Sequence, residues 1–214
     1  MPEIEKEIQY LLEIKEENLI TKQLQKINDL FLTEYMVKIG NIEIIPLETE
    51  IYYHNDNQQF EDKMIHKNEL QKSRFGQLYF HRKGFSKNNE IILFPRGGVD
   101  ICISDNNYYL SILLRMVLVN NELISGINKI QQIFYKGSNK EDILKWLKKL
   151  EERKELIIKR NKTDDTIYHQ LRIQSGVYKD DEKYKLNSMV LKYLDSSKLK
   201  DSIKKQIKEG NYGK

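Results

Sequence analysis

Residues 41–52 read N-I-E-I-I-P-L-E-T-E-I-Y, and apolar side chains recur there at every second position. A period of two is typical of a β-strand with one buried face. Glu48, Glu50 and Tyr52 alternate with the apolar residues, so the sequence predicts that these three side chains share the other face. Pro46 has no N–H group to donate to a sheet, which favours a sheet edge or a bulge at that position.

Three more strands are predicted in residues 77–82, 99–104 and 109–119, which alternate in the same way or form short apolar runs. Together with the first strand they predict a mostly antiparallel, curved β-sheet within residues 41–135. Arg115 is the lone charge in the middle of the last predicted strand.

Helices are predicted before and after this sheet. Residues 3–38 carry apolar residues at three- and four-residue spacing, which forms one stripe, and Asn18 could divide the segment into two helices. Gly40 is suited to end the helical segment, because a residue without Cβ readily adopts the left-handed conformation. The predicted fold class is α+β, with N-terminal and C-terminal helices packed on the sheet.

The chain after the sheet is expected to be mainly helical. The predicted elements are helices at residues 123–135, 140–150 and 196–208 and a strand at residues 166–177. Neither an internal repeat nor a linker divides the chain, so we expect a single domain over residues 1–214. Its parts are the N-terminal helices (1–40), the sheet with the candidate site (41–135) and a mainly helical basic region (136–214).

Composition limits the class of protein. The chain has 214 residues, of which 39% are hydrophobic, enough to bury a core without disulfides. It begins without a signal-peptide pattern and has no apolar run long enough to span a membrane. Cys102 is the single cysteine, which excludes an internal disulfide and multi-thiolate zinc sites, and its apolar neighbours favour a small buried hydrophobe. We therefore expect a cytoplasmic protein.

Charge is unevenly distributed along the chain. Residues 136–214 contain 21 Lys/Arg and 13 Asp/Glu, a net charge of +8, whereas residues 1–135 contain 15 and 19, a net charge of −4. Residues 63–96 form a second basic stretch. Such local positive fields suit a polyanion such as nucleic acid. An ordinary lysine-rich solvated surface is the alternative interpretation.

Arg115 needs an anionic partner if its strand is buried, because burying an unpaired guanidinium is costly. The partner could be a ligand phosphate or one of three carboxylates, those of Glu48, Glu50 and Asp100. An internal ion pair could serve the fold alone, and a cluster of this kind could equally mark a functional site.

Glu50 is a candidate general base if its strand face lines a cleft, since partial burial raises the pKa of a carboxyl towards working pH. Its alternating position is also typical of a solvent-facing residue. His66 and His81 could donate protons or hydrogen bonds to a ligand. The four histidines lack metal-site spacing, and the chain has no phosphate-binding glycine motif or nucleophile elbow, so we expect neither a metal nor a bound cofactor.

Four short motifs follow one another in the middle of the chain: L-E-T-E-I-Y at residues 47–52, G-Q-L-Y at residues 76–79, Gly98, and S-I-L-L-R at residues 111–115 with Gly126 beyond it. In this order they resemble the alkyl-purine (3-methyladenine) DNA glycosylase family. That family shows an E-T-E-A-Y strand, a G-x-L-Y-V-Y strand, a Y-G turn and a V-L-L-R-A strand. The resemblance covers about half of the chain.

The resemblance implies a monofunctional DNA N-glycosylase that removes a modified purine base. In such enzymes the second glutamate of E-T-E activates the water that attacks the sugar of a flipped nucleotide. By position Glu50 would be this catalytic residue, and Arg115 matches the arginine of L-L-R. The residues expected to bind the substrate are Tyr52, His66, His81, Asp100 and Arg115.

The chain departs from the family at several positions. The family's tyrosine that wedges into the duplex corresponds to Gly97 here, and base flipping loses its plug without it. Asp100 replaces an aromatic residue, Ser104 replaces an asparagine, and residues 84–95 are an insertion. These differences favour the alternative of a non-catalytic module that binds nucleic acid or a small anionic or nucleotide ligand through Arg115 and the basic stretch.

Overall fold

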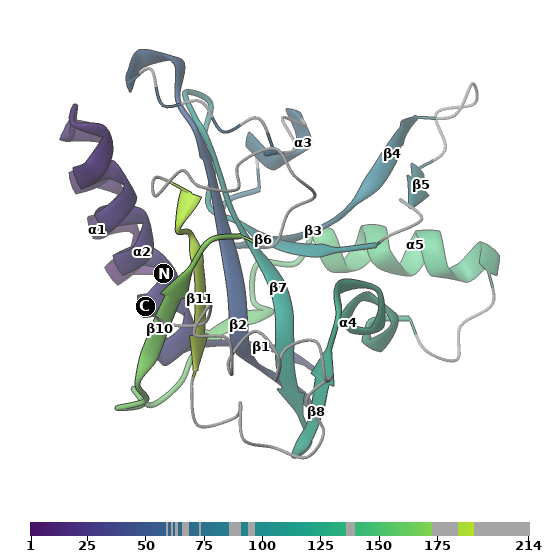
Figure 1. The fold of residues 1–214 in the computed structure, drawn as a ribbon. Helices are drawn as coiled ribbons and strands as arrows, with labels where there is room; N and C mark the ends of the chain where they lie inside the picture. Colours follow the sequence, from purple (N-terminus) through teal and green to yellow (C-terminus); the bar gives the residue numbers. More distant parts are fainter. Residues whose placement is uncertain are drawn as a thin grey trace.

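Two helices, α1 (Pro2–Glu13) and α2 (Glu17–Glu34), begin the chain and lie side by side in the computed structural model (Figure 1). Their buried residues recur at three- and four-residue spacing, so the predicted apolar stripe is confirmed. The break between the helices precedes Asn18, because Ile14 is already extended, with a ψ of 136°.

The structure describes residues 1–58, 60, 62, 64–65, 69–72, 74–85, 91–93, 97–135, 140–172 and 184–190. The helix predicted at residues 196–208 lies outside this part of the chain. The same holds for the last residues of the strand predicted at 166–177 and for His66.

The helix expected to reach residue 38 ends at Glu34, and the strand β1 (Tyr35–Ile39) follows it. Tyr35 and Val37 are buried, and β1 pairs with β2 and β9 on its two sides, so tertiary pairing overrides the helical pattern there. Gly40 does not end a helix. It lies with a φ of 57° in the turn between β1 and β2.

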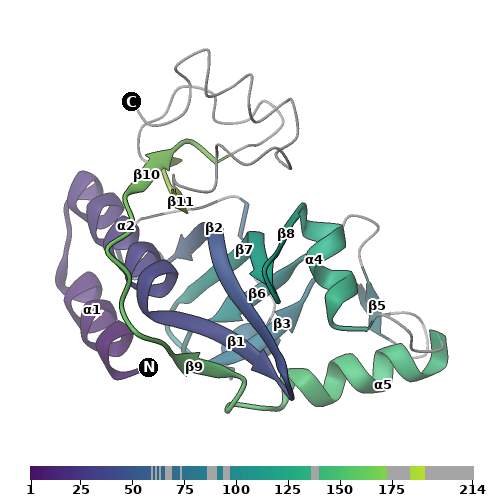
Figure 2. The ribbon, with the colours of Figure 1, turned by 90° about the horizontal axis from the view of Figure 1, so that it is seen from below.

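Nine of the described strands form one antiparallel sheet, which confirms the predicted α+β class (Figure 1, Figure 2). The order along the sheet is β10-β11-β2-β7-β6-β3, with β1 beside β2, β9 beside β1, and β8 beside β7. The strands are β2 (Ile42–His54), β3 (Gln77–Phe80), β6 (Val99–Cys102), β7 (Tyr109–Val119), β8 (Glu122–Ser125), β9 (Ile157–Lys159), β10 (Ile167–Gln170) and β11 (Asn187–Val190). A separate pair consists of β4 (Arg82–Phe85) and β5 (Ile91–Leu93).

Pro46 lies at a bulge inside the sheet, not at its edge. On one side β2 pairs with β7 throughout, and the register shifts between Pro46 and Glu48. On the other side β1 pairs with residues 42–44 and β11 with residues 48–50. Pro46 therefore falls between two partner strands, where a missing N–H group disrupts no ladder.

The shorter helical elements surround the sheet. They are η1 (Asp56–Gln58), α3 (Glu69–Lys72), α4 (Ile127–Ile133) and α5 (Lys140–Glu151). The predicted helix at residues 140–150 is confirmed as α5. The helix expected at 123–135 begins later, because Asn120 and Asn121 turn β7 back into β8 with positive φ angles. Within the described part of the chain, no helix combines the length and the apolar character that crossing a membrane requires.

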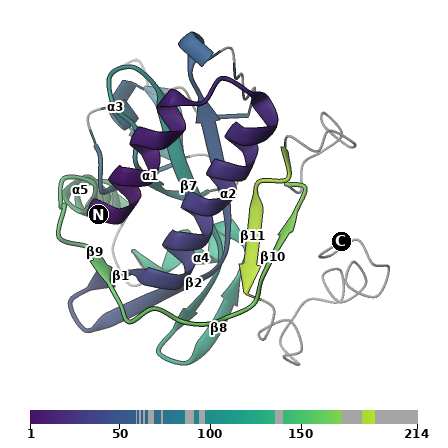
Figure 3. The same ribbon diagram turned by 90° about the vertical axis from the view of Figure 1, so that its left-hand side faces the viewer.

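The helices α1 and α2 lie across one face of the sheet, as Figure 3 shows from the helical side. The core joins their apolar stripe to buried residues of the sheet and to Ile130 of α4 and Leu147 of α5. The sheet contributes fully buried side chains from four neighbouring strands, β2, β7, β6 and β3, among them Ile51, Leu114, Ile101 and Leu78. Burial of this face leaves the alternate residues of the same strands on the opposite face. That opposite face carries the polar residues.

Gly40 offers a test of the first turn. No atom lies within 4 Å of the position that a Cβ on Gly40 would take, so Gly40→Ala changes only the backbone preference. We expect it to lower the free energy of unfolding by about 1 kcal/mol, measured by urea denaturation. Gly40→Asn should lose less, because asparagine tolerates the left-handed conformation. Equal losses in the two variants would contradict this explanation.

Candidate active site

The polar face of the sheet holds a row of residues that crosses five strands. Glu50 is paired with Asn187 of β11 on one side and with Leu113 of β7 on the other. Leu113 is paired with Asp100 of β6, and Asp100 with Tyr79 of β3. Directly opposed residues in antiparallel strands project to the same side. This cross-strand row therefore places Glu50 and Asp100 on one face, with Leu113 between them.

Glu50 is fully buried, and its carboxylate is held by hydrogen-bond donors from three strands. Arg115 Nη1 donates to Oε2 over 3.0 Å, and the Tyr52 hydroxyl donates to the same oxygen over 2.7 Å. Asn187 Nδ2 lies 3.5 Å from Oε1. The solvent-facing position that alternation also allowed for Glu50 is thus wrong, because both faces of β2 are covered here.

Glu48 lies beside Glu50 and is also buried. Its Oε1 accepts a hydrogen bond from Asn187 Nδ2 over 2.9 Å and lies 3.5 Å from Arg115 Nε. Burial raises the pKa of Glu48, an effect that the charge of Arg115 and the Asn187 bond reduce and the charge of Glu50 reinforces. Two buried carboxylates therefore share one guanidinium.

Arg115 reaches both carboxylates because β7 bulges at this residue. Leu114 is paired with Thr49 and Met116 with Glu48, so Arg115 is the extra residue between two paired positions. Burial alone would lower the pKa of Arg115, and the charges of the two carboxylates outweigh that effect and raise it. The Arg115 side chain is 23% exposed, whereas those of Glu48 and Glu50 are 4% and 1% exposed, so Arg115 is the partly exposed member of this cluster.

His81 contacts Asp100 and belongs to a second cluster on the same face. Its Nε2 lies 2.7 Å from Asp100 Oδ1, and Gln71 Nε2 and Ser111 Oγ each donate to Oδ2 over 3.2 Å. The imidazole packs directly on Gly98, where an added Cβ would lie 2.4 Å from Nδ1. Gly98 is therefore required for this position of His81.

Gly97 faces α4 and has no room for a side chain. A Cβ there would lie 2.1 Å from Oε1 of Gln131 and 2.7 Å from Oδ1 of Asn128. Its φ of 47° also disfavours other residues. Ser104 has a structural partner, since its hydroxyl donates to the Leu110 carbonyl over 2.9 Å. The position that carries the wedge in the resembled family is thus packed against a helix in this chain.

Three residues of the site were missed in the sequence: Asn187, Arg172 and Asp62. Arg172 and Asp62 form a buried ion pair, with nitrogen-to-oxygen distances of 2.6 and 3.0 Å. The signal that pointed to Arg115, an arginine between apolar residues in a strand-like segment, also occurs at residues 171–173. Asn187 and Asp62 carry no comparable local signal.

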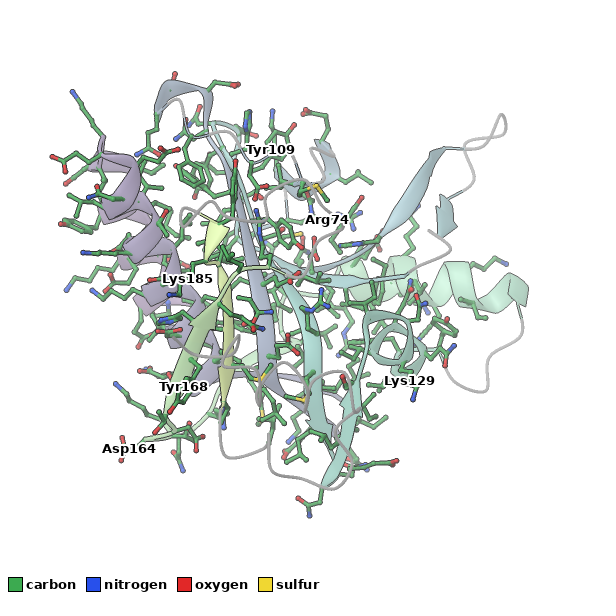
Figure 4. All side chains as sticks on the ribbon, viewed as in Figure 1. Arg74, Tyr109, Lys129, Asp164, Tyr168 and Lys185 are labelled. Atoms are coloured by element: carbon green, nitrogen blue, oxygen red, sulfur yellow. The ribbon has the colours of Figure 1, made fainter. Side chains whose placement is uncertain are left out.

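Tyr109 lies near the upper end of the sheet in the view of Figure 4, and its hydroxyl donates to Glu69 of α3 over 2.6 Å. Tyr109, Tyr52, Leu113 and Ile65 form a small buried apolar cluster beside the two acidic clusters. Two surface hollows of about 440 and 400 Å³ lie elsewhere and are not lined by Glu48 or Glu50. No group of three or more histidine, cysteine or acidic side chains in the described segments is arranged to hold a metal ion.

A comparison of the chain with protein-family models finds no model that matches it, and a comparison with curated proteins finds no match either.

Glu48 makes the stability of the protein depend on pH. Its pKa is raised above 4.5 in the folded state, so the unfolded chain releases this proton first as the pH rises. The contribution of Glu48 to the free energy of unfolding is therefore greatest below about pH 4 and falls as the pH rises through the raised pKa. Glu48→Gln should remove this fall, as urea denaturation between about pH 4 and 8 would measure.

The quantity to compare is the free energy of unfolding of the wild type minus that of Glu48→Gln. This difference should decline as the pH rises. Glu43→Gln removes an exposed carboxylate from the same strand and controls for the loss of one negative charge. A difference that stays flat or increases between pH 4 and 8 would contradict the burial argument for Glu48.

Proposed function

We propose that this protein is a metal-free N-glycosylase that hydrolyses the bond between a modified purine base and its sugar. The observation that carries the proposal is the environment of Glu50. Its carboxylate is buried on the polar face, and Arg115 and the Tyr52 hydroxyl both bind its Oε2. A carboxylate held in one orientation in a buried site is suited to accept a proton from water.

In the proposed reaction the oxygen of a water molecule bonds to the anomeric carbon of the sugar, and its proton passes to Glu50. The bond between this carbon and the base nitrogen breaks, and its electron pair leaves with the base. Positive charge develops on the sugar in such reactions, and nearby carboxylates stabilise it. Glu50 and Asp100 face the same side of the sheet.

The other residues have proposed roles in holding the substrate. We assign Tyr52 of β2 and His81, which follows β3, to the binding of the base, with Asp100 orienting the His81 ring. Arg115 is the exposed part of the Glu50 cluster and could meet the anionic backbone of DNA. We place this activity in the cytoplasm, whose reducing conditions suit the free thiol of Cys102.

The proposal predicts that Glu50→Gln abolishes base release. The amide keeps the shape and an acceptor oxygen but cannot take the proton, so the rate should fall by about 100-fold or more. The measurement is release of hypoxanthine or 3-methyladenine from a duplex oligonucleotide. Glu43→Gln, on the same strand but exposed, should retain the wild-type rate. Equal base release by the wild type and Glu50→Gln, or none by either, would refute the mechanism.

A second candidate function is a non-catalytic module that binds nucleic acid or a small anionic or nucleotide ligand. The observation that favours it is the packing of Gly97 against Gln131 and Asn128, which leaves no space for a side chain that could plug a duplex. On this proposal Arg115 supplies the anion-binding group.

The two candidates differ in a binding experiment. A non-catalytic nucleic-acid module should bind duplex DNA with an affinity that falls steeply as salt rises, and should release no base. Arg115→Met should weaken this binding if Arg115 contacts a phosphate. Binding of a free nucleotide without affinity for DNA would instead indicate a small-ligand module. Base release that depends on Glu50 would exclude both versions.

A further inference from the structure

Arg172 and Asp62 form an ion pair that is almost completely buried. The exposed fractions of their side chains are 1% and 0%, and two nitrogens of Arg172 bind the two oxygens of Asp62. Arg172 lies two residues after the end of β10, whereas Asp62 lies beyond the end of β2. A third contact joins Arg172 Nη1 to the Ile51 carbonyl over 3.3 Å. The pair therefore links two distant parts of the chain next to the C-terminal part of β2.

The same guanidinium lies over the ring of Tyr52. Its central carbon is 4.4 Å from the ring centroid and 5.3 Å from that of Tyr184, both within the range of a cation–π contact. Tyr52 thus has Arg172 over its ring and Glu50 at its hydroxyl, 2.7 Å from Oε2. Burial, with the nearby charge of Glu50, holds the pKa of Tyr52 well above its usual value. The hydroxyl therefore stays protonated and remains a donor.

A buried ion pair is by itself weak evidence of a contribution to stability. Removing two charges from water is costly, and apolar residues of similar volume often replace a buried ion pair without loss of stability. An ion pair has a property that apolar residues lack, since two parallel hydrogen bonds fix the plane of the guanidinium. A fixed guanidinium plane in turn fixes the aromatic ring that it covers.

We infer that Arg172 and Asp62 are positioning residues that orient the Tyr52 hydroxyl on Oε2 of Glu50. This inference rests on the proposed function. Tyr52 and Arg115 then occupy Oε2 together, and the carboxylate is held in one orientation relative to the face on which water and substrate would bind. Neither Arg172 nor Asp62 contacts the reacting atoms in this arrangement.

The test is a cycle of four proteins: the wild type, Tyr52→Phe, the pair variant Arg172→Met/Asp62→Asn, and all three substitutions together. The pair variant removes both charges at once and so leaves no buried ion unpaired. Its matched control is Arg74→Met/Glu151→Gln. That pair joins the partly buried Arg74, which lies just after α3 (Figure 4), to the fully buried Glu151, 2.5 Å away.

The first readout is base release, measured as kcat and KM. The pair variant should lower kcat by about tenfold or more with little change in KM, because a misplaced general base loses rate and not substrate affinity. The same two substitutions should cost less than about threefold when Tyr52 is already Phe. The control variant should keep kcat within about threefold. An equal loss of kcat in the control, or the same loss with and without the Tyr52 hydroxyl, would overturn the inference.

The second readout is independent of activity. Removing the Tyr52 hydroxyl should lower the urea midpoint of unfolding clearly more in the wild-type background than in the pair variant, where the hydroxyl is no longer held on Glu50. Equal shifts in the two backgrounds would overturn the inference. If the wild type releases no base but this coupling is present, the proposed function fails and the positioning of Tyr52 by Arg172 stands.

Discussion

Two buried carboxylates, Glu48 and Glu50, share the guanidinium of Arg115, and the geometry of the polar sheet face follows from that charge balance. A buried carboxylate loses its hydration, so it persists only where donors and an opposite charge replace the lost water. The donors here come from different strands: Arg115 from a bulge in β7, Tyr52 from β2 and Asn187 from β11. The pairing of β11 with β2 is therefore needed to complete the cluster.

The proposed chemistry uses the contrast between the two faces of one sheet. The face towards α1 and α2 is apolar. Burial of its side chains stabilises the fold and offsets the free-energy cost of burying charged groups on the other face. On the charged face, Glu50 and Asp100 stand on either side of Leu113, each with its own partners: Arg115 and Tyr52 for Glu50, His81 for Asp100. A rigid strand backbone beneath both clusters is the kind of support that precise acid–base geometry requires.

Much of this arrangement was predictable because β-strands alternate with a period of two. The shared face of Glu48, Glu50 and Tyr52 and the need of Arg115 for a carboxylate partner both follow from local patterns. The predictions are wrong where pairing between strands overrides those local patterns. Residues 35–38 were expected to extend the helix but form part of β1 between two strands, and Gly40 lies in a hairpin turn where a helix end was expected.

The amino-acid sequence was sufficient for the α+β class, the long central strands, the shared face of Glu50 and Tyr52 and the anomaly at Arg115, because all of these depend on residues within about ten positions of one another. Only the tertiary structure decided that Glu50 is buried, that His81 pairs with Asp100, and that Arg172 lies over Tyr52. Each of these features depends on residues that are separated in the sequence. Strand register and loop closure bring those residues together, and no local pattern encodes either of them.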